Sequence, residues 1–79
     1  MCNLITLDML PVDKTGVVRC FKCCGSEIRR LQDMGLCCGV RVKAVQKSPS
    51  GDPVAYSFRG VVVALRDMDA KNIVIALCN

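Results

Sequence analysis

The chain has 79 residues, of which 52% are hydrophobic and 23% are charged, with a formal net charge of +4. This length allows one domain with a modest core, and so high an apolar content excludes an intrinsically disordered chain. We therefore expect a single folded domain over residues 1–79.

No targeting or membrane segment is recognisable in the sequence. Asp8 and Asp13 lie among the apolar residues near the N-terminus, unlike the charged start and apolar run of a signal peptide. Apolar stretches such as that from Val61 to Leu65 are far short of the roughly 18 residues that suggest a membrane span. We expect a soluble, cytoplasmic protein that does not insert into a membrane.

Alternating apolar residues predict about five strands. The first and least regular runs from Gly16 to Phe21, and the second covers residues 40–47. In the second strand Val45 breaks the alternation, which predicts a β-bulge near Ala44. The other three strands cover residues 54–58, 61–65 and 73–77.

One short α-helix is predicted between the first and second of these strands. Ser26 is a candidate N-cap, and Ile28, Leu31 and Met34 fall on one face. Gly35 follows as a C-terminal stop. A helix of about nine residues makes only about 2.5 turns, so it must pack against the sheet to be stable.

Turn-forming residues separate the later strands. Residues 48–53 predict a hairpin loop, Gly60 a tight turn, and residues 66–72 a loop or one helical turn. Short strands with a single helix are typical of a small barrel, in which closure removes exposed strand edges. The predicted fold is mainly β, a small SH3-like barrel.

Several short motifs occur in a fixed order along the chain. They are Leu7-Asp8-Met9-Leu10-Pro11, Gly16, Arg29-Arg30-Leu31-Gln32-Asp33-Met34-Gly35-Leu36, Gly39, Ser48-Pro49-Ser50-Gly51-Asp52-Pro53, Ala64-Leu65-Arg66, and Ala70 with Ile73. Their order and spacing resemble the ferrous iron transport protein A (FeoA) family, over nearly the whole chain. One departure is Cys38, which stands where the family usually has a proline before Gly39.

The resemblance implies an SH3-like barrel that serves ferrous iron uptake. Such a protein is an accessory factor that docks on the cytoplasmic part of the membrane Fe²⁺ permease with a GTPase domain (FeoB) and modulates it. The family is associated with transition metal ions, and the same barrel ends the iron-dependent repressors. The alternative is therefore a stand-alone regulatory or metal-binding module. Whether the chain forms a homo-oligomer is left open.

The predicted helix carries the candidate partner-binding residues Arg29, Arg30 and Asp33. They form either a cationic contact patch or a solvated face, in which Glu27 and Asp33 lie one turn from Arg30. A short edge strand is the other candidate contact surface.

Seven cysteines are many for this length, and the candidate metal ligands among them are Cys20, Cys23, Cys24, Cys37 and Cys38. A C-x-x-C supplies half of a zinc site, but no second such pair and no histidine is present. The helix separates the two adjacent cysteine pairs by roughly 13 Å, whereas ligands of one zinc lie about 4 Å apart. We expect reduced thiols and no required cofactor. Weak Fe²⁺ or Zn²⁺ binding, within one chain or between subunits, stays open.

Catalytic and nucleic-acid-binding signatures are missing from the sequence. A cysteine nucleophile usually needs a histidine base, and the carboxylates are dispersed. Gly51-Asp52-Pro53 is a turn and not a phosphate loop. Lys and Arg are scattered and aromatic residues are few. We expect neither an enzyme nor a nucleic-acid-binding protein.

Overall fold

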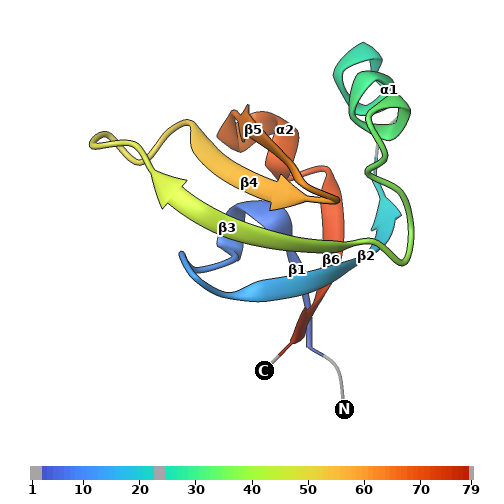
Figure 1. The fold of residues 1–79 in the computed structure, drawn as a ribbon, viewed down its shortest axis with the longest axis horizontal. Helices are drawn as coiled ribbons and strands as arrows, with labels where there is room; N and C mark the ends of the chain where they lie inside the picture. Colours follow the sequence, from blue (N-terminus) through green and yellow to red (C-terminus); the bar gives the residue numbers. More distant parts are fainter. Residues whose placement is uncertain (1–2, 23–24, 79) are drawn as a thin grey trace.

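The computed structural model describes residues 3–22 and 25–78. Its elements are β1 (Leu4–Thr6), the 3-10 helix η1 (Leu7–Met9), β2 (Thr15–Phe21), α1 (Ser26–Asp33), β3 (Arg41–Lys47), β4 (Val54–Phe58), β5 (Val61–Leu65), α2 (Asp67–Ala70) and β6 (Ile73–Cys78). The strands form one antiparallel sheet in the order β1-β6-β2-β3-β4-β5, which curls around the core (Figure 1).

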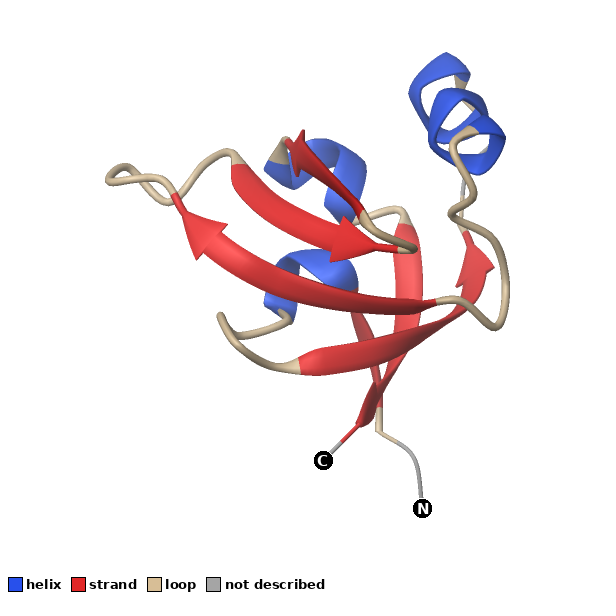
Figure 2. Cartoon of the chain, in the orientation of Figure 1, coloured by secondary structure: helices blue, strands red, loops and turns tan. Residues whose placement is uncertain are grey.

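The mainly β fold agrees with the sequence pattern, but the strand count differs. The described chain has six strands, not about five, because Leu4–Thr6 pairs with Val74–Ala76 of β6. Three residues are too few to show a period of two, so this strand has no signal in the sequence. The helix α1 lies between the two strands predicted to flank it, which are the second and third of the chain (Figure 2).

The sheet is open, so the prediction that the strands close into a barrel is wrong. β1 and β5 stand at opposite ends of the strand order and are not paired with each other. Each therefore has one edge whose backbone N–H and C=O groups have no described strand beside them.

The core lies inside the curled sheet and consists of apolar side chains. Along β4 every second residue is buried, namely Val54, Tyr56 and Phe58, as the alternation predicted. The buried hydroxyl of Tyr56 donates a hydrogen bond of 3.2 Å to the carbonyl of Leu7, which fixes η1 against the sheet. η1 also contacts α2, whose Ala70 is buried, so the predicted helical turn after β5 is present.

Turns and a bulge shape the strands as the sequence indicated. The β3–β4 register shifts between Ala44 and Gln46, which is the predicted bulge. The β4–β5 turn consists of Arg59 and Gly60, with φ values of 51° and 79°. Two consecutive positive φ angles are typical of a type I′ hairpin turn, whose twist matches that of the strands.

The helix α1 begins one residue earlier than the predicted N-cap at Ser26 suggested. Gly25 is the N-cap, and Ser26 is the first helical residue without a capping hydrogen bond. Ile28 and Leu31 are buried in the core as expected, because they lie on the face turned to the sheet. Met34 is at the C-cap and 37% exposed, so it does not belong to this face. Among the described residues, no helix is both long and apolar enough to cross a membrane.

Candidate functional site

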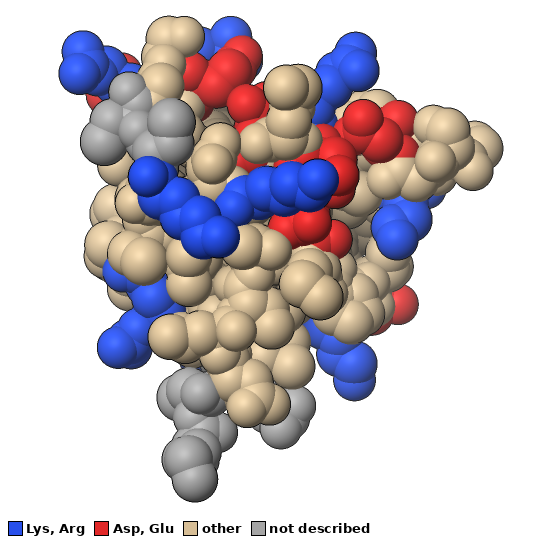
Figure 3. Space-filling view, turned by 180° about the vertical axis from the view of Figure 1, so that it is seen from behind, with Lys and Arg blue, Asp and Glu red and all other residues tan. Residues whose placement is uncertain are grey.

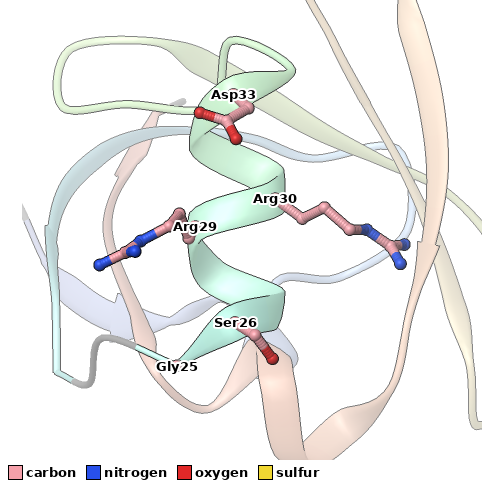
Figure 4. A pocket seen from close by; sticks show the side chains of 5 residues that line it. All are labelled: Gly25, Ser26, Arg29, Arg30 and Asp33. Carbon is pink, nitrogen blue, oxygen red and sulfur yellow. The ribbon is translucent and has the colours of Figure 1, made fainter.

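The predicted partner-binding residues occupy the solvent face of α1. Arg29, Arg30 and Asp33 are all exposed. With Gly25 and Ser26 they line a shallow depression beside the helix. Figure 4 shows Arg29 and Arg30 pointing to opposite sides of the helix, so their guanidinium groups do not converge on one point. This arrangement suits contact with a broad surface better than enclosure of a small ligand.

Only one of the two predicted carboxylate neighbours of Arg30 forms an ion pair with it. The Nη2 atom of Arg30 lies 3.7 Å from Oε2 of Glu27, and the two side chains are 71% and 47% exposed. An ion pair so exposed contributes little stability, because water screens it. In the part of the chain that the structure describes, Arg29 and Asp33 form no ion pair. Both arginines are therefore available to a partner.

On the face seen from behind, cationic side chains do not form one continuous patch (Figure 3). Figure 3 shows Lys and Arg in a short band across the middle of this face and at separate places around its margin, with the acidic residues mainly in its upper half. A continuous basic surface is the electrostatic feature that favours nucleic acid. This face has no such feature, in keeping with the scattered Lys and Arg of the sequence.

The candidate metal ligands are only partly within the described residues. Cys20, Cys37 and Cys38 are exposed free thiols, whereas Cys23 and Cys24 lie outside the described range. Within residues 3–22 and 25–78 no cluster of three or more His, Cys, Asp or Glu side chains could hold a metal ion. The predicted separation of the two adjacent cysteine pairs involves Cys23 and Cys24, and it stays a prediction.

Cys38 nevertheless lies closer to the strand before the helix than the helix length suggests. Its thiol donates a hydrogen bond of 3.2 Å to the carbonyl of Arg19 on β2, next to Cys20 in sequence. Gly39 N–H donates to the carbonyl of Val18 at 2.8 Å, which also holds the returning chain against β2. The chain after α1 therefore returns to β2, which the helix length alone does not reveal.

Cys38 occupies a turn position that the sequence did not identify. The N–H of Val40 donates to the carbonyl of Cys37 at 3.1 Å, which closes a four-residue turn. Gly39, its third residue, has a φ of 92°, whereas Cys38 does not have a positive φ. This combination defines a type II turn, in which proline is common at the second position and glycine at the third. Cys38 stands at the second position, where a proline would fix the backbone φ angle that the turn requires.

Among the residues that the structure describes, one titratable group is strongly perturbed, and its role is structural. Burial, followed by the nearby carboxylates of Asp8, Asp67 and Asp52, raises the pKa of Tyr56 from 10.0 to about 12. Burial and negative neighbours both disfavour the phenolate. Tyr56 is 1% exposed and donates its hydrogen bond to a backbone carbonyl, so its role is in the core.

Solved structures of similar chains share this fold. The FeoA-like protein from Clostridium acetobutylicum is 28% identical, with a TM-score of 0.88 over 100% of this chain and 92% of that chain. Stenotrophomonas maltophilia FeoA, solved as a zinc complex, is 31% identical, with a TM-score of 0.79 over 90% of this chain and 88% of that one. It is described as an SH3 domain protein suggested to act as a bacterial ferrous iron transport activating factor.

A more distant structure shares only the fold. A manganese-dependent transcriptional repressor is 14% identical, with a TM-score of 0.83 over 99% of this chain and 44% of that protein. A comparison with curated proteins finds no significant match. A family model for the FeoA domain, in contrast, matches residues 5–77, nearly the whole length. The chain belongs to the FeoA domain family, has its SH3-like fold, and is thereby linked to iron transport.

Proposed function

We propose that this chain is a cytoplasmic accessory protein of ferrous iron uptake, which docks on the cytoplasmic part of the Fe²⁺ permease and modulates it. The observation that carries the proposal is the FeoA family match over residues 5–77, within a chain of 79 residues. The description of the Stenotrophomonas maltophilia relative as a transport activating factor supports it. Docking, and not catalysis, is the activity that a small domain of this kind would contribute.

The solvent face of α1 is the docking surface we propose. Its two arginines are exposed, and the only carboxylate within 4.0 Å of either, among the described residues, is that of Glu27 on the same helix. Arginine is enriched at protein interfaces, since its planar group forms paired hydrogen bonds with carboxylates. A partner surface with exposed Asp or Glu would therefore complement this face.

Modulation requires that the chain bind one state of the permease more tightly than another. A ligand shifts a conformational equilibrium only by its differential affinity for the states. A GTPase domain would supply them, because its conformation differs between its nucleotide-bound states. We therefore expect the affinity of this chain to depend on the nucleotide bound to the permease.

A binding titration against the cytoplasmic domain of the permease, under reducing conditions and in each nucleotide state, tests the proposal. Replacing Arg29 and Arg30 together by Glu should weaken binding by at least about tenfold, roughly 1.4 kcal/mol. The matched control replaces Arg41 and Lys43 by Glu, because both are exposed on β3 and the charge change is the same.

Circular dichroism should show that both double variants keep the fold. Binding by the wild-type chain and the β3 variant, but not by the α1 variant, supports docking through α1. Equal loss in both variants would mean that net charge alone drives binding. No binding by the folded wild-type chain in any nucleotide state would overturn the proposal.

A further inference from the structure

The edge strand β5 differs from every other strand because it is apolar throughout and exposed. Its burial pattern is exposed at Val61, Val62 and Ala64, intermediate at Val63 and buried only at Leu65. Val62 is 62% exposed, although valine is a residue that usually lies in cores. No charged residue, proline or bulge interrupts the strand or its pairing with β4.

The hairpin geometry tells which backbone groups of β5 face the open edge. In a two-residue hairpin the residues that flank the turn, here Phe58 and Val61, exchange both ladder hydrogen bonds. Bonded and non-bonded pairs then alternate along the strands. The N–H and C=O groups of Val62 and Ala64 consequently point away from β4. No described residue hydrogen-bonds to them from the other side.

The other edge of the sheet is protected in a way that β5 is not. β1 has only three residues, and a very short edge strand offers few groups for pairing. β5 has five residues and none of the usual devices against edge-to-edge pairing. Of the two edge strands, β5 is therefore the one that offers more backbone groups for pairing with another strand.

We propose that the occupant is a second copy of this chain, with the two β5 strands paired antiparallel about a twofold axis at Val63. This interface lies apart from the α1 face and does not depend on the proposed docking to the permease. In this register Val62 of each copy lies opposite Ala64 of the other, so the outward N–H and C=O groups of both residues become hydrogen-bonded. A twofold interface is self-complementary, as such pairing requires.

Side-chain size and charge favour this register. The larger Val62 faces the smaller Ala64, on the same side of the sheet as Ser57 and Ala55. Val63 is the middle residue of β5, so a twofold axis at Val62 or Ala64 would pair only part of the strand with its copy. Beyond the ends of β5, the turn residue Arg59 of one copy and Asp67, the first residue of α2, of the other flank the paired strands, so no like charges are brought together there. The described part of Arg59's own chain offers it no carboxylate within 4.0 Å.

Sedimentation equilibrium in reducing buffer tests the proposal, because reduction prevents crosslinking through the exposed thiols. The mass should rise with concentration from the 8.6 kDa of one chain towards twice that value. Ala64→Pro removes only an N–H that faces the open edge, and Val62→Lys places a charge on that edge. Both variants should stay monomeric. Ser57→Lys adds the same charge opposite Val62 but on the inner strand β4, and it should dimerise like the wild type.

Amide hydrogen exchange locates the contact. On dimer formation, exchange at Val62 and Ala64 should slow, while exchange at Val61 and Val63, already bonded to β4, should change little. A chain that stays monomeric at millimolar concentration overturns the proposal. So does a dimer in which Ala64→Pro has no effect or the Val62 amide is unprotected. Protection of Val62 only after the permease domain is added would assign the edge to that partner instead.

Discussion

Replacing Cys38 by proline should stabilise the fold, because the structure places this residue at the second position of a type II turn. Gly39 supplies the positive φ of 92°, and the Val40 N–H closes the turn on Cys37. Proline needs a φ near −65° and has no N–H to donate. No described group accepts a hydrogen bond from the Cys38 N–H, so the substitution removes no backbone bond.

The expected gain follows from what proline changes. Restricting the unfolded chain at a compatible position stabilises a protein by about 0.4–1 kcal/mol. The lost interaction is the thiol bond to Arg19, which is exposed and has a weak donor. For a domain of this size the net gain corresponds to a rise in Tm of roughly 2–8 °C.

Thermal unfolding followed by circular dichroism in reducing buffer measures this shift, with two comparison variants. Cys38→Ala removes the thiol without stiffening the backbone, so its Tm should equal or fall slightly below that of the wild type. Gly39→Ala forces a side chain into the left-handed region and should cost about 1–2 kcal/mol. A Cys38→Pro variant less stable than Cys38→Ala would refute the turn assignment.

Two further substitutions test the core. Tyr56→Phe should cost about 1 kcal/mol, because the Leu7 carbonyl loses one of its two hydrogen-bond donors and keeps only the Leu10 N–H. The pKa of Tyr56 is raised in the folded state, from 10.0 to about 12, so its contribution is complete below pH 10 and is lost as the pH rises towards 12. Urea unfolding between pH 9 and 12 should show this loss in the wild type and less of it in Tyr56→Phe; identical profiles would contradict the prediction. Gly16→Val should destabilise by roughly 1–3 kcal/mol, since even a Cβ there comes within 2.7 Å of the buried Ile75 Cδ1. Gly16→Ala should cost less, and an unchanged Tm for Gly16→Val would show that β2 and β6 are less tightly packed than described.

Most of the fold was accessible from the sequence because its strands alternate strongly. Val54, Tyr56 and Phe58 predicted the buried face of β4, and Val45 predicted the bulge in β3. β1 could not be predicted, because three residues carry no measurable period. The open sheet was missed for a different reason. Closure depends on whether the first and last strands of the sheet meet, and local patterns do not report that contact.

The candidate site was accessible only in part. Arg29, Arg30 and Asp33 could be assigned to a helix face, and they are exposed there. That the two arginines diverge depends on side-chain directions, which spacing alone does not give. The turn role of Cys38 was missed because the distance along the helix hid the return of the chain to β2. The family's proline at this position was the signal that could have revealed it.

The account's central claim is that this chain acts on ferrous iron transport through the permease. Its most direct test is Fe²⁺ uptake into proteoliposomes that contain the purified permease and GTP, with and without saturating amounts of this chain. We predict that the chain changes the uptake rate, and that the Arg29→Glu, Arg30→Glu double variant does so only at much higher concentration. An uptake rate unaffected by the folded wild-type chain at any concentration would contradict the account.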